Sequence, residues 1–186
     1  MKVLLISAYF PIKADDPARS FVSDEACALS KTGVEVHVAR WRYAGRFFNT
    51  KDSVVDGIPV HGLKLFSPKN LFIGFSNLWR LPVSLFPLKE LGRTEVFFSY
   101  GKQVEKIVKS YNIDVIHAHF AYPEGFVGLI AKRRIEKPLV VTLHGADVLV
   151  EPTVKYGYRL NLEVDRVVRM VLRFILFTRF FIKVGR

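Results

Sequence analysis

The sequence predicts an α/β fold in which helices cover a doubly wound, mostly parallel sheet. Short runs of apolar or β-branched residues, typical of strands, recur at residues 2–8, 34–39, 58–65, 114–119 and 139–143. Segments with apolar residues at helical spacing lie between several of these runs, at residues 21–31, 96–111 and 123–134. Strands that alternate with helices of this length are joined by right-handed crossovers, which makes neighbouring strands parallel.

The ends of the predicted elements carry their own signals. The first run, residues 2–8, is continuously apolar, as expected of a strand that is buried on both faces. Asp56 and Gly57 predict a turn immediately before the third strand. Pro123 and Glu124 predict a helix start, because proline and acidic residues both favour the first helical turn.

Two segments depart from the alternation of strands and helices. We assign residues 1–154 to one domain and expect residues 66–98, rich in Pro, Leu and Phe, to form an irregular or helical insertion in it. Residues 155–186 are expected to form one long helix that is basic on one side and apolar on another. The end of this segment has no cap or stop signal, which suggests a truncated connection to a further domain.

Composition and charge restrict the class of partner. A chain of 186 residues can bury one sizeable core. The net charge of +11 favours anionic partners, which include nucleic acid, acidic membrane surfaces and phosphate-bearing small molecules. We do not expect nucleic-acid binding, because the basic residues are scattered and no nucleic-acid-binding motif is present.

Cysteine and hydropathy patterns address the compartment. Cys27 is the single cysteine and cannot form an internal disulfide, which indicates a reducing, cytoplasmic location. No segment predicts a transmembrane helix. The aromatic residues between positions 71 and 98, together with the basic charge, are consistent with peripheral binding to the inner membrane face. The alternative is that these aromatic residues are buried within the protein or against another domain.

Polar and small residues gather where three of the predicted strands end. Ligands of open parallel sheets bind beyond the carboxyl ends of the strands, where the strand order reverses. The loops after the first, fourth and fifth strands should meet there. Their candidate substrate-binding residues are Phe10, Pro11, Arg19, Ser20, Tyr122, Glu124, Gly125, His144, Gly145 and Asp147.

Several of these residues have two interpretations. Glu124 either marks a helix amino terminus that binds an anion or is an acid favoured by the helix dipole. Residues 144–147 (HGAD) either contact a ligand or form a tight turn in which Asp147 caps the next helix. His117 and His119 lie on the same face of a strand. Because no third ligand has recognisable spacing, we expect no metal site. We expect His119, nearest the strand end, to contact substrate, and His117, deeper in the strand, to have a structural role.

The order of motifs resembles the amino-terminal domain of family-4-like glycosyltransferases with the GT-B fold. The resemblance rests on residues 9–11 (YFP), 21–25 (FVSDE), 33–38 (GVEVHV), 114–128 (DVIHAHFAYPEGFVG) and 137–148 (KPLVVTLHGADV). It covers roughly residues 1–160 and leaves residues 66–98 unassigned. The family implies a Rossmann-like domain that holds the acceptor, facing a second, similar domain.

The resemblance implies a retaining transfer of sugar from a nucleotide-sugar to a glycan or a lipid-linked acceptor. His119 would be the candidate catalytic residue, near the transferred sugar. No cofactor is implied, and the nucleotide-sugar donor would be held mainly by a carboxyl-terminal domain, through a Gly-rich loop and a pair of glutamates separated by seven residues. No such pair follows Val148. The chain alone is therefore expected to be inactive.

Two features depart from the family pattern. Family members commonly have glycine in the first loop, where Arg19 and Ser20 stand in this chain. A sixth strand should also follow the helix that begins near Lys155, whereas the chain ends in FTRFFIKVGR. The alternative function is a non-catalytic remnant, or a split subunit that pairs with a separate donor-domain chain.

Overall fold

One seven-stranded sheet forms the centre of the part of the chain that the structure describes. The computed structural model describes residues 1–11, 13, 16, 21–41, 51–64, 91–177 and 182–184. The strands are β1 (Lys2–Ile6), β2 (Glu35–Arg40), β3 (Ser53–Val55), β4 (Ile58–Gly62), β5 (Val115–His119), β6 (Leu139–Leu143) and β7 (Ile182–Val184). The helices are α1 (Phe21–Lys31), α3 (Leu91–Tyr111), α4 (Phe126–Lys132) and α5 (Leu162–Phe177), with a π-helical turn at Ala121–Gly125 and a 3₁₀ turn at Tyr158–Leu160.

The strand order confirms the predicted doubly wound sheet. The order is β3-β4-β2-β1-β5-β6-β7, and every neighbouring pair is parallel except β3 and β4. Without the antiparallel edge strand β3, this is the Rossmann order, in which the connections reverse direction beside the first strand. The reversal lies between β1 and β5, where Ile6 pairs with Ala118.

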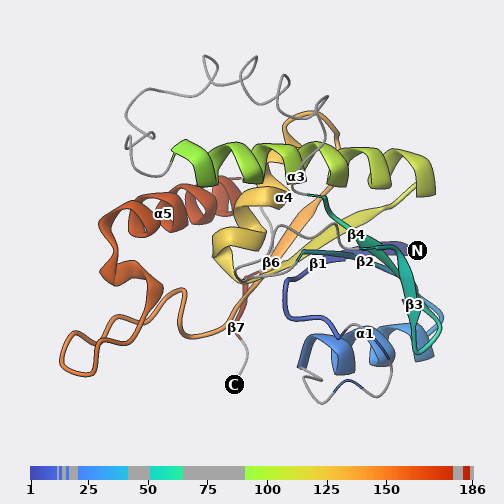
Figure 1. Ribbon diagram of the computed structural model, residues 1–186, viewed down its shortest axis with the longest axis horizontal. Coiled ribbons are helices and arrows are strands. Elements are labelled where there is room, and N and C mark those ends of the chain that lie inside the picture. The colour runs from blue at the N-terminus through green and yellow to red at the C-terminus, as the bar shows by residue number, and fades with distance from the viewer. Residues whose placement is uncertain are drawn as a thin grey trace.

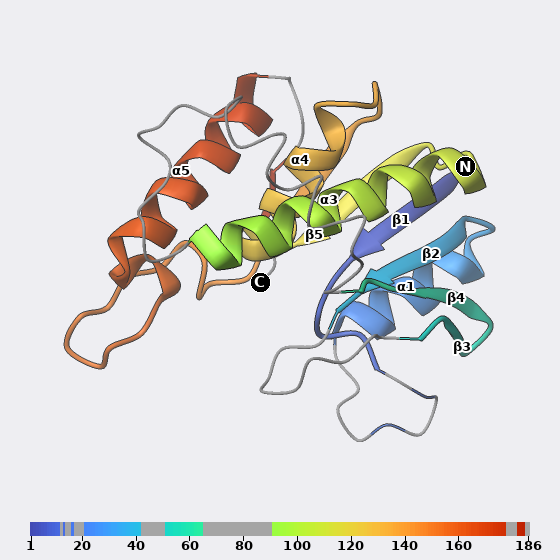
Figure 2. The same cartoon turned by 45° about the horizontal axis from the view of Figure 1, so that its top comes forward.

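Helices cover the two faces of the sheet unequally. Helix α1 lies on one face, and α3, α4 and α5 lie on the other (Figure 1). The turned view separates α1, beside β2, from the layer of α3 and α4 (Figure 2). Alternate residues of β1 enter different cores: Leu4 and Ile6 pack on the α3–α5 side, whereas Val3 and Leu5 pack with α1. The continuous apolar run predicted this burial on both faces.

The expected single helix over residues 155–186 is wrong. Glu151 and Tyr156 pair across a turn, and α5 begins only at Leu162. Asn161 caps this helix, because its Oδ1 accepts hydrogen bonds from the backbone N–H groups of Glu163 and Val164. The sixth parallel strand that we considered missing is β7, within FTRFFIKVGR, and it pairs with β6.

The middle of the chain is described in part. Strand β3 was not predicted, and it forms a hairpin with β4 across the expected turn at Asp56 and Gly57. Helix α3 begins at Leu91, so the last part of the proposed insertion at residues 66–98 is helical. Residues 65–90 lie outside the described residues. Within the described part, no helix combines the length and the apolar character needed to cross a bilayer.

The first prediction tests the position of the core. Replacing Ile116, fully buried in the central strand β5, with Ala should lower the free energy of unfolding by about 2–5 kcal/mol, because the lost side chain leaves a cavity. The matched control is Val54→Ala on β3, where 69% of the residue is exposed, and it should change stability by less than about 0.5 kcal/mol. Urea unfolding measures both. Equal losses would contradict this assignment of core and edge.

Candidate functional site

The candidate site lies at the carboxyl ends of β1 and β5, where the strand connections reverse. Ala8 and Tyr9 follow β1, and Phe120 follows β5 directly. The backbone N–H of Phe120 donates to the carbonyl of Thr142 at 2.8 Å, which extends the β5–β6 pairing to the edge of the sheet. The sheet therefore brings segments more than 110 residues apart into one place, as expected for a doubly wound fold.

Glu124 contributes a fully buried carboxyl group to this edge. The backbone N–H of Ala8 donates to its Oε1 at 3.2 Å, which links the π-helical turn to the end of β1. Its Oε2 is buried and makes no hydrogen bond within the described part of the chain. Burial raises the pKa of Glu124 to about 8, against the weaker opposing effect of backbone hydrogen bonds. At neutral pH Glu124 is therefore protonated and can donate a hydrogen bond.

Phe120 holds an unusual backbone conformation between the strand end and the π-helical turn. Its φ is 75° and its ψ is 143°, a region that residues other than glycine rarely adopt. Its carbonyl accepts a hydrogen bond from the N–H of Gly125 at 3.0 Å. Its ring centroid lies 5.3 Å from that of Tyr9 and 4.5 Å from that of His144. These contacts retain a strained backbone at a place where the side chain lines a pocket.

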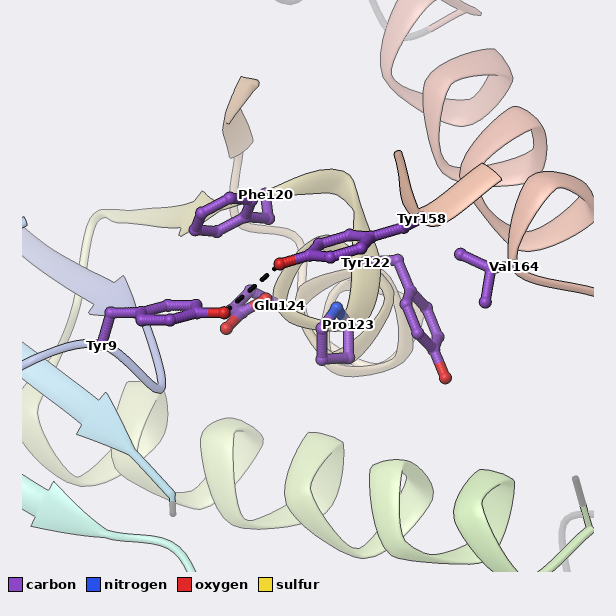
Figure 3. A pocket seen from close by; sticks show the side chains of 7 residues that line it. All are labelled: Tyr9, Phe120, Tyr122, Pro123, Glu124, Tyr158 and Val164. Atoms are coloured by element: carbon purple, nitrogen blue, oxygen red, sulfur yellow. Dashed lines mark hydrogen bonds between the residues drawn. The ribbon is translucent and has the colours of Figure 1, made fainter. Parts of the chain in front are cut away.

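An aromatic pocket of about 330 Å³ opens beside Glu124. Figure 3 shows the side chains that line it, which are Tyr9, Phe120, Tyr122, Pro123, Glu124, Tyr158 and Val164. The hydroxyl groups of Tyr9 and Tyr158 lie 3.3 Å apart and approach each other close to the carboxyl group of Glu124 (Figure 3). Burial and the hydrogen bond with Tyr9 raise the pKa of Tyr158, so the Tyr158 hydroxyl stays a neutral hydrogen-bonding group around neutral pH.

Two histidines and Asp147 form a second group of polar residues at this edge. Nδ1 of His119 lies 3.1 Å from Nε2 of His144. Burial, with the neighbouring His117 and His144 contributing less, lowers the pKa of His119 to about 3, so its imidazole is neutral. The carboxylate of Asp147 accepts from the backbone N–H of His144 at 2.8 Å and from that of Ala121 at 2.7 Å. Asp147 therefore connects the segment after β6 with the turn that carries Glu124.

The histidines face the α1 side of the sheet. The ring centroid of Phe21, in the first turn of α1, lies 4.4 Å from that of His144 and 6.2 Å from that of His119. His117 lies deeper along the strand, where its Nε2 is 2.8 Å from Oγ1 of Thr142. Its Nδ1 is 3.4 Å from Oε1 of Glu25 on α1. The sequence contains no local signal for this last contact, because Glu25 and His117 belong to different elements.

Some residues that were predicted to bind substrate are packed in the core or have a role in the backbone conformation. Phe10 is 2% exposed and belongs to the core on the α1 side, and Pro11 is buried, so we assign both to packing. Gly125 is buried, and a Cβ atom there would lie 3.1 Å from both Phe120 O and Val171 Cγ1. Gly145 has a φ of 64°, which favours glycine. Arg19 and Ser20 lie outside the described residues.

The structure does place Tyr122 and Glu124 on the aromatic pocket, and it places His119 and His144 in contact with each other. Asp147 lies in the tight turn after β6 but does not cap a following helix; its carboxylate accepts from the backbone N–H groups of His144 and Ala121. The site analysis of the sequence missed Tyr9, Phe120 and Tyr158 as pocket residues. Tyr9 and Phe120 had a usable signal, since each directly follows a strand end. Tyr158 had none, because its segment resembled a helix.

Comparison with known proteins identifies the family. The model of Glycosyltransferase Family 4 matches residues 18–181. A segment of 46 residues is 44% identical to an uncharacterised glycosyltransferase of Methanocaldococcus jannaschii, and it covers 25% of this chain and 13% of that protein. Over 168 residues the chain is 24% identical to TuaC of Bacillus subtilis, a glycosyltransferase assigned provisionally to teichuronic acid biosynthesis. That alignment covers 84% of this chain and 39% of TuaC.

Solved structures agree on the fold. Sucrose-phosphate synthase from Thermosynechococcus elongatus superposes with a TM-score of 0.54 at 13% identity, covering 90% of this chain and 39% of that one. A shorter form of the same enzyme gives a TM-score of 0.51 at 16% identity, covering 95% of this chain and 71% of that one. The described fold is one Rossmann-like half of the GT-B architecture. Because the family match extends over most of its length, the chain belongs to glycosyltransferase family 4.

Proposed function

We propose that this chain is the acceptor-binding half of a retaining glycosyltransferase that transfers a sugar from a nucleotide-sugar to a glycan or lipid-linked acceptor. The observation that supports this most is the aromatic pocket beside the buried carboxyl of Glu124, at the edge where doubly wound sheets bind ligands. Membership of glycosyltransferase family 4 gives the reaction class. The provisional assignment of TuaC to teichuronic acid biosynthesis makes a polymer of that kind a suitable class of acceptor.

The lining of the pocket suits a sugar ring. The carbon-bound hydrogens on one face of a pyranose pack well on aromatic rings such as Tyr9 and Phe120. The sugar's hydroxyl groups need hydrogen-bonding partners, and the pocket offers the Tyr9 and Tyr158 hydroxyls. A sugar hydroxyl that replaces the hydrogen bond between the two tyrosines can form a hydrogen bond with Oε2 of Glu124, which has no partner within the described residues. A neutral carboxyl group is both donor and acceptor, which matches a hydroxyl group better than a charged ligand.

His119 is proposed to lie near the transferred sugar, as the family resemblance implies. Its buried, neutral imidazole is held in position by His144, whose backbone is held in turn by Asp147. The nucleotide and phosphates of the donor are proposed to bind mainly to a second domain, in the same polypeptide or in a separate one. Catalysis requires both halves, because positioning and charge stabilisation of the transition state come from both sides of the cleft.

The transfer assay tests the division of labour between the two halves. The 186-residue chain should transfer no radiolabelled sugar from UDP- or GDP-sugars to a membrane lipid extract, and calorimetry should show weak or no binding of these donors. Transfer should appear when the chain is combined with, or fused to, a donor domain that carries the glutamate pair. Micromolar binding of a nucleotide-sugar to the chain alone would show that this half holds the donor site, which would contradict the proposal. Failure of every pairing would favour a non-catalytic remnant.

In the paired enzyme, Glu124→Ala should raise KM for the acceptor about tenfold, the cost of one lost hydrogen bond, while KM for the nucleotide-sugar stays unchanged. Glu124→Gln keeps a neutral hydrogen-bonding group and should recover most of the loss. An equal rise in KM for the donor would contradict an acceptor pocket.

The raised pKa of Glu124 predicts a pH dependence of stability. Between pH 4.5, the ordinary pKa of a glutamate, and about 8, the unfolded chain has lost this proton while the folded chain retains it. The unfolded state therefore binds fewer protons, and the contribution of Glu124 to stability falls as pH rises through this window, then levels off above it. Glu124→Gln should lack this loss, so its stability relative to the wild type should grow between pH 5 and pH 8 in urea unfolding. The exposed Glu136→Gln serves as the matched control. A constant difference for Glu124→Gln would show that the carboxyl is ionised throughout.

We further propose a peripheral membrane contact on the cytoplasmic face, consistent with a lipid-linked acceptor. The aromatic residues that suggested it lie mostly outside the described residues. A different feature supports it: Leu149, Val154 and Leu162 are 59%, 71% and 75% exposed, and the loop that carries the first two extends away from the sheet (Figures 1 and 2).

Co-sedimentation with vesicles tests the membrane contact. Binding should be stronger to vesicles that contain phosphatidylserine than to neutral ones, because the chain carries a net charge of +11. The double variant Val154→Ser and Leu162→Ser should weaken it, whereas the control Val54→Ser, equally apolar and exposed but on β3, should not. Binding that is no stronger to anionic than to neutral vesicles would contradict the membrane contact.

A further inference from the structure

Three possible metal ligands meet on the α1 side of the sheet. One donor atom each from Glu25, His117 and His119 lies within 4.8 Å of the others. The sequence offered only the two histidines of β5 and no third ligand at recognisable spacing. Tertiary structure supplies the third, because α1 packs beside the strand and brings Oε1 of Glu25 to 3.4 Å from Nδ1 of His117.

The second nitrogen of each imidazole is already engaged, as in metal sites whose ligating histidines are oriented by neighbouring groups. Nε2 of His117 lies 2.8 Å from Oγ1 of Thr142, which leaves Nδ1 on the side of Glu25. Nδ1 of His119 lies 3.1 Å from Nε2 of His144, which leaves its own Nε2 for the cluster. Each ring is thus restrained through one nitrogen and presents the other.

The observation that points to a ligand is the state of His119. Its side chain is fully buried, and its Nε2 makes no hydrogen bond within the part of the chain that the structure describes. A buried polar atom without a partner costs free energy, and a bound cation would remove that cost. The side chain of Glu25 is 34% exposed and that of His117 is 11% exposed, so an ion can reach the cluster from solvent past Glu25.

We propose that Glu25, His117 and His119 bind one divalent cation of the zinc class. Two imidazoles and one carboxylate form a donor set that zinc accepts, with a further coordination position open to water or substrate. The ion would connect α1 with β5 beside the reversal of the strand order. The proposal does not depend on sugar transfer, because its test measures the metal directly.

The experiment titrates the metal-free chain, in a Cys27→Ser background that removes the thiol as a competing ligand, with Zn²⁺ by calorimetry and with Co²⁺ by visible absorption. We expect one ion per chain, a rise in melting temperature that EDTA reverses, and two imidazole ligands by X-ray absorption at the zinc edge. Glu25→Gln and His117→Gln should each weaken binding at least tenfold.

The matched control is Asp24→Asn, an exposed acid one position earlier on α1, which should leave binding unchanged. Circular dichroism of the metal-free variants separates loss of ligand from loss of fold. The X-ray absorption spectrum of the unsubstituted cluster tests the ligands without any variant. Absence of saturable one-to-one binding, a spectrum without imidazole, or binding that survives both Glu25→Gln and His117→Gln would overturn the proposal.

Discussion

The parallel pairing of β1 with β5 is the constraint on which the rest of the structure depends. Because both strands run in the same direction, their carboxyl ends lie side by side, and the chain leaves them toward opposite halves of the sheet. That arrangement opens a space that the following loops must line. The carboxyl of Glu124 bridges the same point through the N–H of Ala8, so the turn after β5 is attached to the end of β1.

The groups at this edge are held in states that a simple core would not tolerate. Glu124 and His119 are both fully buried, and each keeps one polar atom without a partner in the described residues. Phe120 keeps a backbone conformation that favours glycine. Each feature reduces stability, and the apolar cores on the two faces of the sheet offset the cost. Features of this kind gather at the carboxyl end of β5, as expected of the proposed site, where a ligand would supply the missing partners.

The amphipathic elements of the fold were predictable, whereas much of the site was not. The alternation within β1, with Leu4 and Leu5 entering opposite cores, follows from an apolar run of strand length. The segment that contains Tyr158 was wrongly predicted to be helical, because its apolar and basic residues fit a helical period. In the structure, Gly157, with a φ of 106°, and the bridge between Glu151 and Tyr156 interrupt the helix. Strand β7 was missed because three residues carry too short a pattern to show a period.

By itself the sequence determined the fold class, the family resemblance and the edge of the sheet at which chemistry should occur, since these follow from local periodicity and from motifs at strand ends. Only the tertiary structure decided which polar atoms meet. Three contacts join residues from distant elements: Glu25 with His117, Tyr9 with Tyr158, and the N–H of Ala8 with the carboxyl of Glu124. Local patterns carry no information on such contacts, because packing of whole helices against the sheet sets the distance between their side chains.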